Sequence, residues 1–579
     1  MAPGPFIDNR PFWQRALIGF CVLVIIALIP IVLSYSLHPV TAPGPAPAGV
    51  HVQILAVNDF HGQLPTGQKL NGKPAGSIPV LASYLRAAMN ESTTDTTFIA
   101  LPGDVVGASP PESGLMLDEP ALLFWNEFAD SCCAKNSACS ASCNMVATLG
   151  NHEFDKGPAE LMRKINGGNG TTTITHLVDP YPGEMAGYAC SNVVWQANGT
   201  PLVTPYVIRN AGGAKIAFIG ADTTKTPSIT MPTNIAGITF LNETESVNRY
   251  IPEIQQQGVH AIVVLLHEGG EEDAYDGATQ NGGNVTGKVK EIVAGLDPDV
   301  DIVLSGHTHE FTNAYLNNSG NRPVLVTQAY SYSRAFADVS LTIDPGTGEV
   351  TQKSAKIVPA YAGEPPGTTP DPAAAALLAE ATEAVAPQTN RVIAVAATDM
   401  TRAQDAAGES ALADLVADGQ RAAVQAEIGF VTTGSVRSDI QKGNITWGNL
   451  YAVQPFAGTI FSVNLTGDQV RKALEQQWES PLPPHNLAVS GLSYTFDEKR
   501  PVGSRIVDIR VNGVPLDERK TYRTALADYL TTGGDGYTEF TKGTGMVAGP
   551  SDIDALVSYI GSLPQPVNGT IDGRVSRIS

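Results

Sequence analysis

The stretch Val303-Leu304-Ser305-Gly306-His307-Thr308-His309 ends an apolar run in a glycine and two histidines. Four other segments share this construction, in which residues typical of a β-strand lead into oxygen or nitrogen ligands. These are residues 54–57 before Asn58-Asp59-Phe60-His61, residues 98–101 before Pro102-Gly103-Asp104, residues 145–148 before Leu149-Gly150-Asn151-His152, and residues 261–266 before His267. Because α/β proteins bind ligands outside the carboxyl ends of their strands, we expect the five strand ends to meet at one site.

The candidate ligands are carboxylates, imidazoles and one amide, a set that suits zinc, manganese or a similar divalent ion. They are Asp59, His61, Asp104, Asn151, His267, His307 and His309. The absence of cysteine from the set argues against a closed structural zinc site. Seven ligands suit two metal ions that share one carboxylate, for which Asp104 is our candidate. Two ions roughly 3.5–4 Å apart activate water and neutralise charge on a phosphoryl group, so the pattern predicts phosphoester hydrolysis.

His152 directly follows the expected ligand Asn151, so it cannot easily bind the same ion. Asp155 comes three residues later, within reach of the imidazole at the start of a helix. We interpret His152 as the general acid or transition-state stabiliser and Asp155 as the residue that orients it. A single histidine after a strand is more often a packed or surface residue. The ordered recurrence at five strand ends favours a site instead.

Taken in order, Asp-x-His, Gly-Asp, Gly-Asn-His-Glu, His and Gly-His-Thr-His resemble the calcineurin-like metallophosphoesterases. Over about residues 50–579 the chain resembles the 5′-nucleotidase family of the bacterial type. The resemblance implies an α/β fold, with an N-terminal metallophosphoesterase β-sandwich flanked by helices (α-β-β-α) and a C-terminal mixed α/β substrate-binding domain. It implies that His152 and Asp155 are catalytic. It assigns one metal ion to Asp59, His61, Asp104 and His309, and the other to Asp104, Asn151, His267 and His307.

The second half of the chain resembles the substrate-binding domain of that family. Residues 408–418 have apolar positions at helical spacing, and residues 428–431 read as a strand. In the family, two aromatic rings hold the nucleotide base and an arginine binds the nucleotide. By position, these residues are Phe456, Tyr529 and Arg437. Gly534 and Asp535, in a loop of turn-forming residues, suit a close approach of the backbone to the same ligand. Residue type alone favours ordinary core packing for the two rings.

The chain departs from the family pattern at several substrate-binding positions. Thr432 replaces the usual Asn, Ser435 replaces the usual Gly, and Tyr529 stands where Phe is common. The arginine often found just before residue 408 is replaced by alanine, and Arg402 is our candidate to take its place. The catalytic half is intact, so the resemblance supports hydrolysis more firmly than the identity of the nucleotide.

The N-terminal segment predicts a location outside the cytoplasm. Residues 16–37 are mostly apolar and long enough to span a bilayer as an anchor. Arg10 and Arg15 precede them, so residues 1–15 would form a cytoplasmic tail and the enzyme would face the periplasm or the cell surface. Residues 38–49, rich in Pro, Ala and Gly, would form a tether. The alternative is a cleaved signal sequence, with a weak cleavage site at 46–48, which would release a secreted protein.

Cysteine usage agrees with an oxidising compartment. Beyond the predicted span the chain contains Cys132, Cys133, Cys139, Cys143 and Cys190. Disulfides are their expected fate, with a small metal site as the alternative. Because five is an odd number, at least one of these cysteines is unpaired within the chain or pairs between chains.

Charge and length limit the partners and the domain organisation. The formal net charge of −21, without a basic stripe, argues against polymeric nucleic acid as a partner and favours a small nucleotide. The 579 residues suffice for two domains. We place the metallophosphoesterase domain at 50–360, a linker with a connector helix at 361–389 and the substrate-binding domain at 390–579. The sequence does not indicate whether the protein is a monomer or an oligomer.

We therefore expect an extracytoplasmic two-metal hydrolase that converts nucleoside 5′-monophosphates to nucleosides and phosphate. Alternatives at the same site are 2′,3′-cyclic-nucleotide phosphodiesterase or 3′-nucleotidase activity and the hydrolysis of nucleotide sugars. Two further alternatives are a thiosulfate-ester hydrolase and a catalytically silent surface binding protein. The aromatic pair argues against the first and the His152/Asp155 pair against the second.

Overall fold

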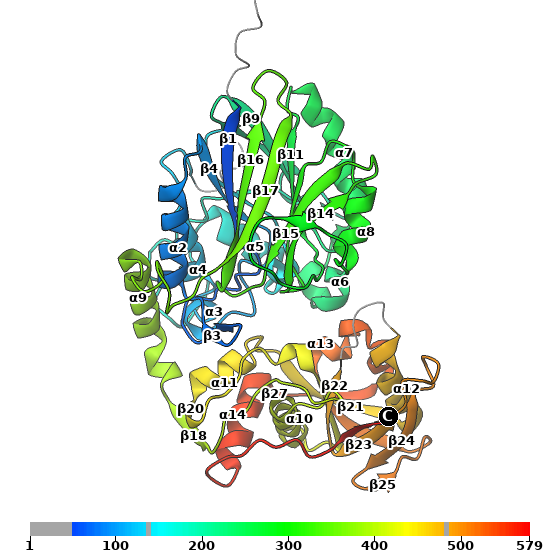
Figure 1. The fold of residues 1–579 in the computed structure, drawn as a ribbon. Coiled ribbons are helices and arrows are strands. Elements are labelled where there is room, and N and C mark those ends of the chain that lie inside the picture. Colours follow the sequence, from blue (N-terminus) through cyan, green and yellow to red (C-terminus); the bar gives the residue numbers. More distant parts are fainter. Residues whose placement is uncertain (1–48, 135–139, 480–485, 579) are drawn as a thin grey trace, which may run out of the picture. The chain divides into compact units, whose positions relative to one another are not determined.

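Two β-sheets form the centre of the N-terminal domain in the computed structural model of the protein, which describes residues 49–134, 140–479 and 486–578 (Figure 1). The strands of the first sheet are β1 (Val50–Ala56), β4 (Thr96–Leu101), β5 (Met145–Ala147), β6 (Gly187–Tyr188), β16 (Ala335–Ile343) and β17 (Val350–Pro359). Their order is β17-β16-β1-β4-β5-β6. β1, β4, β5 and β6 run parallel, so their carboxyl ends lie at one edge of the sheet.

The second sheet is also mixed, with a parallel centre. Its strands are β8 (Tyr206–Ala211), β9 (Ala214–Asp222), β11 (Ala261–His267), β12 (Gln280–Asn281), β13 (Ile302–Ser305), β14 (Phe311–Asn317) and β15 (Pro323–Ala329). Their order is β12-β14-β15-β13-β11-β9-β8. β9, β11, β13 and β15 are parallel neighbours. All five strands expected before the candidate ligands are present, and they are divided between the two sheets.

Side-chain alternation along the strands builds a four-layer sandwich. In β1, Val52 and Ile54 point into a core shared with β9, β11 and β13 of the other sheet. Leu55 points to the opposite face, where it joins a core formed with helices. Both faces of the central strands are therefore buried, which explains why their sequences are continuous apolar runs.

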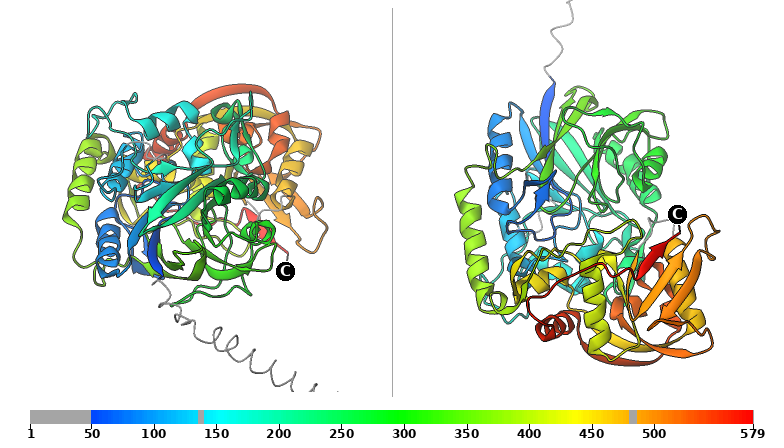
Figure 2. Two further views of the ribbon diagram at one scale, coloured as in Figure 1. Left: turned by 90° about the horizontal axis from the view of Figure 1, so that it is seen from above. Right: turned by 60° about the horizontal axis from the view of Figure 1, so that its bottom comes forward.

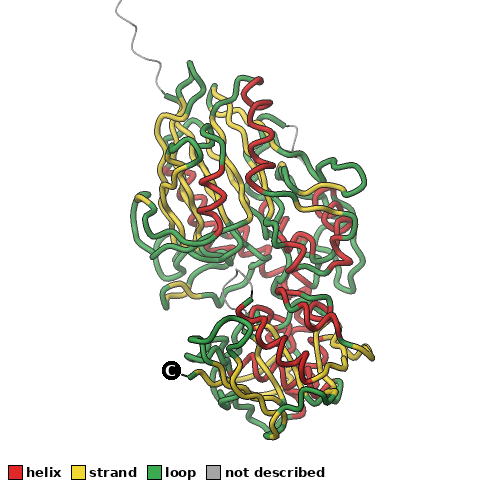
Figure 3. Tube along the Cα trace, turned by 90° about the vertical axis from the view of Figure 1, so that its right-hand side faces the viewer, coloured by secondary structure: helices red, strands yellow, loops and turns green. Residues whose placement is uncertain are grey.

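Helices cover the outer face of each sheet (Figure 3). On the first sheet these are α2 (Ile78–Glu91), α4 (Glu119–Asn126) and α5 (Gly157–Asn166), while the short α3 (Pro111–Gly114) contacts α4 and α9 (Pro372–Thr389). On the second sheet they are α7 (Glu243–Gln256) and α8 (Lys288–Gly295). The expected α-β-β-α arrangement is confirmed. Short elements complete this domain: β2 (Lys69–Leu70), β3 (Lys73–Pro74), η2 (Asn151–Phe154), β7 (Val193–Trp195), α6 (Thr226–Ile229), η3 (Pro232–Ile235) and β10 (Ile238–Phe240).

Helix α9 (Pro372–Thr389) connects the two domains and packs beside α2 (Figure 2). Its start follows from the sequence, because the Asp371 side chain accepts hydrogen bonds from the backbone N–H groups of Ala373 and Ala374. Pro372, which lacks an N–H, suits the first helical position. Buried Ala374, Ala381 and Val385 attach α9 to the core of the N-terminal domain.

The C-terminal domain is also mixed α/β, as expected. Its strands are β18 (Val392–Ala396), β19 (Ile428–Thr432), β20 (Gly443–Thr446), β21 (Thr459–Thr466), β22 (Leu487–Ser490), β23 (Leu492–Phe496), β24 (Ile506–Val511), β25 (Val514–Pro515), β26 (Thr521–Ala527), β27 (Thr544–Ser551) and β28 (Val575–Arg577). Its helices are α10 (Ala411–Ala423), η4 (Thr433–Ser435), α11 (Trp447–Val453), α12 (Gly467–Glu475), η5 (Gln476–Trp478), α13 (Asp528–Thr531), η6 (Gly534–Gly536), η7 (Thr538–Lys542) and α14 (Asp552–Ser562). The central sheet has the order β22-β19-β26-β21-β27.

Two predictions concern the cysteines and the N-terminus. A disulfide joins Cys133 and Cys143, which confirms disulfide formation, whereas exposed Cys132 and buried Cys190 have no disulfide partner among the described residues. Cys139 lies outside the described residues. The predicted tail at 1–15 and span at 16–37, and all but the last residue of the tether at 38–49, also lie outside them. From Gly49 onward, no helix among the described residues is long and apolar enough to cross a membrane.

Candidate metal and catalytic site

The seven predicted ligands converge at the carboxyl ends of β1, β4, β5, β11 and β13. Loops after the first three strands carry Asp59, His61, Asp104 and Asn151, all of them buried. His267 is the last residue of β11 and is fully buried, while His307 and His309 after β13 are partly exposed. The two facing sheets thus contribute from opposite sides to one cluster.

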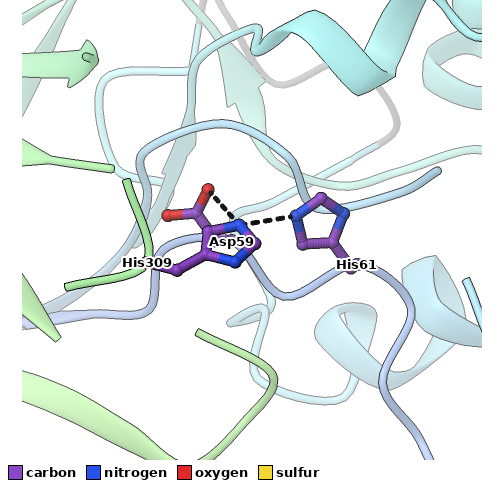
Figure 4. A group of neighbouring side chains, drawn as sticks. All are labelled: Asp59, His61 and His309. Atoms are coloured by element: carbon purple, nitrogen blue, oxygen red, sulfur yellow. Dashed lines mark hydrogen bonds and ion pairs between the residues drawn. The ribbon is translucent and has the colours of Figure 1, made fainter. Parts of the chain in front are cut away.

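One half of the cluster contains Asp59, His61 and His309, whose polar atoms point toward one another (Figure 4). His309 Nε2 lies 3.3 Å from Asp59 Oδ1 and 3.1 Å from His61 Nε2. His61 Nε2 is in turn 3.6 Å from Asp104 Oδ2. Asp104 therefore adjoins this half.

The other half contains Asp104, Asn151, His267 and His307. His267 Nε2 lies 3.1 Å from Asp104 Oδ2 and 3.3 Å from Asn151 Oδ1. His307 Nδ1 lies 3.1 Å from the same amide oxygen. The Asp104 carboxylate borders both halves, which is the position that a shared carboxylate needs.

The donor set fits divalent metal ions. The second ring nitrogen of His61 lies 3.0 Å from the Gly107 carbonyl oxygen, and that of His267 lies 3.0 Å from the Pro102 carbonyl oxygen. With metal bound, a proton on each Nδ1 would satisfy these carbonyls and leave Nε2 as a lone pair that faces the cluster. Lone pairs and carboxylate oxygens then face one another at close range, and a bound cation stabilises this arrangement.

The two carboxylates are ionised at neutral pH, as metal ligands must be. Burial alone would raise the pKa of Asp59, but the neighbouring His309 lowers it to about 2. Burial acts in the same way on Asp104, and His267 and His152 hold its pKa well below the usual range.

Five of the seven candidate ligand residues have a left-handed backbone, an uncommon conformation for residues with a Cβ atom. Their φ angles are 51° at Asp59, 50° at His61, 51° at Asp104, 76° at His307 and 62° at His309. The loops are also tightly fitted, since a Cβ added at Gly150 would lie 2.4 Å from Asp104 Oδ1. Strain of this kind is concentrated at functional sites.

His152 lies next to this cluster and is hydrogen-bonded as the sequence predicts. Its Nδ1 is 2.8 Å from Asp155 Oδ2, and its ring packs against His61 with centroids 5.0 Å apart. Burial lowers the pKa of His152, but Asp155 and Asp104 together raise it above the usual value. The pair therefore favours an imidazolium that can give up a proton from Nε2.

Glu153, the last residue of the Gly-Asn-His-Glu motif, turns away from the cluster and binds backbone. Its carboxylate accepts hydrogen bonds from the N–H groups of Gly150 (2.6 Å), Asp104 (2.9 Å) and Val105 (2.9 Å). Burial and the nearby Asp104 carboxylate raise the pKa of Glu153 to about 7.

Two predicted substrate-binding residues of the C-terminal domain lie beside His152. The Phe456 ring stacks on the imidazole, with centroids 6.2 Å apart and planes inclined by 20°. The Arg437 guanidinium is close enough to lower the pKa of both His61 and His152, although burial is the larger effect on each. Its Nε and Nη2 are buried without a hydrogen-bond partner among the described residues.

The remaining predicted substrate residues fall into two places. Gly534 packs against the Tyr529 ring, since a Cβ added there would lie 2.4 Å from the ring. The Tyr529 hydroxyl donates to Asp535 Oδ1 at 2.6 Å and lies 3.3 Å from the Ser228 carbonyl oxygen in α6. Arg402 is exposed and donates hydrogen bonds to the Asp439 carboxylate and to the backbone carbonyl of Arg437. It therefore stabilises the backbone of Arg437.

Sequence reasoning missed two features of the site. The loop after β9 is a sixth strand end, where Lys225 pairs at 3.0 Å with buried Glu268 directly after His267. Its apolar run followed by Asp222 could have identified it. The Tyr332 ring packs against His61 and His309, with centroids 5.5 and 5.2 Å away. No local sequence pattern identifies Tyr332. Its position depends on a contact between distant parts of the chain, since its backbone N–H donates to the Asp59 carbonyl.

The chain matches two family models. Residues 52–311 match calcineurin-like phosphoesterase, and residues 388–542 match 5′-nucleotidase, C-terminal domain. The first covers all seven candidate ligands together with His152 and Asp155. The second covers Arg402, Arg437, Phe456, Tyr529, Gly534 and Asp535.

Similar proteins cover nearly the whole chain. Endonuclease YhcR of Bacillus subtilis (strain 168) is 31% identical over 539 residues, which are 91% of this chain and 41% of that protein. Cell wall protein Lmo0130 of Listeria monocytogenes is 32% identical over 558 residues, which are 88% of this chain and 67% of that protein. The solved 5′-nucleotidase precursor from Thermus thermophilus has a TM-score of 0.73 at 25% identity, over 91% of this chain and 99% of that one. The chain thus spans less than half of YhcR.

Proposed function

The chain belongs to the 5′-nucleotidase family, with a calcineurin-like phosphoesterase domain followed by a 5′-nucleotidase C-terminal domain, and on that premise we propose that it releases phosphate from nucleoside 5′-monophosphates. It is a metal-dependent phosphoesterase. The observation that carries the choice of a nucleotide is the stacking of Phe456 on His152, which places an aromatic ring of the C-terminal domain beside the proposed general acid.

We assign two metal ions to the cluster. Asp59, His61, Asp104 and His309 would hold one ion, and Asp104, Asn151, His267 and His307 the other. When bound, such ions polarise the phosphoryl group and activate a water molecule as nucleophile. The residues that surround them provide the remaining chemistry.

His152 and Asp155 supply the proton that the departing ester oxygen needs. Asp155 accepts a hydrogen bond from the Nδ1–H group of His152 and fixes the ring, so that Nε2 would face the leaving group. The raised pKa of His152 keeps this proton available at neutral pH. Arg437, whose Nε and Nη2 have no hydrogen-bond partner in the described part of the chain, would bind the anionic part of the nucleotide.

The base would lie between Phe456 and Tyr529. Each ring already has one face engaged by the protein, Phe456 by His152 and Tyr529 by Gly534. A base stacked on the remaining faces would be held with little preference among purines and pyrimidines, because stacking accepts any π-face.

An extracytoplasmic location is part of the proposal. The relative Lmo0130 is named a cell wall protein, and the similar Thermus structure is titled a precursor. The Cys133–Cys143 disulfide adds support, because disulfides persist in oxidising compartments.

Phosphate release by the full-length protein tests the proposal. After metal removal, adding zinc or manganese back should restore hydrolysis of AMP. His152→Ala should lower kcat by roughly 100- to 10,000-fold, the usual contribution of general acid catalysis. His260→Ala is the matched control, because that histidine lies partly exposed beside Glu349 and away from the cluster. Its activity should equal that of the wild type.

The substrate panel separates the neighbouring activities. It includes 2′,3′-cyclic AMP, 3′-AMP, UDP-glucose and a single-stranded oligonucleotide, because the relative YhcR is named an endonuclease. The formal net charge of −21 favours the small substrates. Metal-dependent cleavage of another substrate with no phosphate release from AMP would reject the proposal.

A further inference from the structure

Glu153 joins the two loops that carry Asp104 and Asn151. Gly150 N–H and Asp104 N–H both donate to Oε2, and Val105 N–H donates to Oε1. The side chain is 2% exposed. Glu153 therefore touches neither solvent nor substrate, and both of its oxygens are occupied by backbone N–H groups rather than free to bind metal.

The backbone that Glu153 holds is in an uncommon conformation. Asp104 has a φ of 51° and Gly103 a φ of 84°, and two of the three donated N–H groups belong to Asp104 and the residue after it. Without these bonds, the N–H groups of a buried left-handed turn would be unpaired.

The two loops also fit closely. A Cβ at Gly103 would lie 3.0 Å from Gly150 N, and the His152 N–H donates to Asp104 Oδ1 at 2.9 Å. A displacement of one loop would therefore move the other, and with it the spacing between the Asp104 carboxylate and the Asn151 amide.

We propose that Glu153 is a positioning residue that fixes Asp104 and Asn151 relative to each other and thereby sets the affinity of the cluster for divalent metal ions. The proposal rests on the two-metal site assigned above. It adds a buried glutamate that acts only through the backbone of the two loops that carry Asp104 and Asn151.

Glu153→Gln tests this role with minimal change in size. Glutamine has one carbonyl oxygen and one NH2 group, so the NH2 group must face at least one backbone N–H donor and leave it unpaired. Metal binding is measured by calorimetric titration of the metal-free, full-length protein with Mn²⁺. We expect binding 10- to 100-fold weaker than in the wild type, as is typical when a residue supporting a metal ligand is replaced.

Steady-state kinetics separate positioning from a general loss of folding. At saturating Mn²⁺, the KM for AMP should stay near the wild-type value, because Glu153 does not touch the C-terminal domain residues that would bind the base. The concentration of Mn²⁺ that gives half-maximal rate should rise with the measured dissociation constant.

Glu184→Gln is the matched control. Glu184 is also fully buried, and its Oε2 accepts a hydrogen bond from the Tyr188 hydroxyl, but among the described residues its side chain makes no hydrogen bond to a ligand loop. Its metal affinity should equal that of the wild type. Glu153→Asp retains the charge but is too short to reach all three N–H groups, so it should weaken Mn²⁺ binding even if Glu153→Gln does not fold.

Wild-type Mn²⁺ affinity in folded Glu153→Gln or Glu153→Asp would overturn the proposal, as would equal losses in Glu153→Gln and Glu184→Gln. The titration contains no nucleotide, so it distinguishes this failure from that of the proposed function. If the wild type binds Mn²⁺ but hydrolyses no AMP, only the nucleotide assignment fails.

Discussion

At the residue scale, Asp414 in α10 is a carboxyl group buried in a polar cluster of the C-terminal domain. It is 1% exposed, and its two carboxyl oxygens have no hydrogen-bond partner in the described part of the chain. Arg574 lies 3.8 Å away but makes two 2.9 Å hydrogen bonds to Asp418. Burial raises the pKa of Asp414 to about 8; Arg574 lowers it, and Glu409 adds to the increase. Asp414 is therefore mostly neutral in the folded protein at pH 7.

The stability of the C-terminal domain should consequently depend on pH through Asp414. Its folded-state pKa of about 8 exceeds the ordinary value of 3.8, so its stabilising contribution is complete below about pH 4 and is lost as the pH rises through 8. The loss is at most about 1.4 kcal/mol per pH unit. Asp414→Asn stays neutral, so its free energy of unfolding should vary less between pH 4 and 8 and exceed that of the wild type at pH 9.

Urea unfolding at pH 5, 7 and 9 measures this difference. Asp418→Asn is the contrasting variant, because it removes the bidentate partner of Arg574 and should destabilise the domain at all three values. Parallel pH profiles for Asp414→Asn and the wild type would show that Asp414 is ionised in the folded protein.

At the element scale, the proposed nucleotide clamp, which consists of the Phe456 and Tyr529 rings, comes from residues in or next to two short elements of the C-terminal domain. Phe456 comes three residues after the end of α11, and Tyr529 lies in α13. The clamp thus depends on the placement of two short elements rather than on a continuous surface, and each ring should contribute separately to base binding.

Alanine substitutions in the clamp test this arrangement. Phe456→Ala and Tyr529→Ala should each raise the KM for AMP by roughly 5- to 150-fold, since stacking contributes about 1–3 kcal/mol per base. The rate on p-nitrophenyl phosphate, which has no base, should change much less. Phe430→Ala is a control for general damage to the domain, because that ring is buried against Phe540. Equal losses on both substrates in the clamp variants would refute base stacking.

The secondary structure around the site was largely predictable from the sequence. Apolar runs identified β1, β4, β5, β11 and β13, because strands buried on both faces cannot tolerate polar residues. The start of α9 was predictable from Asp371 and Pro372. The left-handed backbone of His61 and the contacts of Tyr332 were not, because they depend on hydrogen bonds between residues far apart in the chain.

Local sequence patterns also did not indicate which strands belong to which of the two sheets. Residues 261–266 and 98–101 read alike as buried strands, and only the pairing of β11 with β9 and β13 separates them. The family resemblance supplied this arrangement. The hydrogen bonds of Glu153 to both ligand loops were not evident from the sequence, since a buried acid that binds backbone has the same sequence signature as a helix cap.

At the scale of the whole molecule, metal binding should stabilise one domain and not the other. The cluster joins loops from both sheets of the N-terminal domain, so an ion bound there links the two halves of the sandwich. A ligand at 100 times its dissociation constant adds about 2.7 kcal/mol to the free energy of unfolding. At roughly 2–4 °C per kcal/mol, the Tm of the N-terminal domain should rise by about 5–10 °C.

Scanning calorimetry with and without a chelator measures this shift. The transition of the C-terminal domain should stay in place and serves as an internal reference. Asp104→Ala should abolish the dependence of the first transition on metal. An unchanged first transition in wild-type protein that binds metal would contradict this expectation.

The left-handed backbone of the ligand residues sets a limit on how this protein can be stabilised. At Asp59, His61, Asp104, His307 and His309, the side chain that the proposed metal site requires is one that the local backbone disfavours. Glycine would relax each of these turns, yet every such replacement would remove a ligand. Selection for thermal stability alone would thus erode the site residue by residue, and a variant library screened only for folding should be enriched in inactive proteins at these five positions.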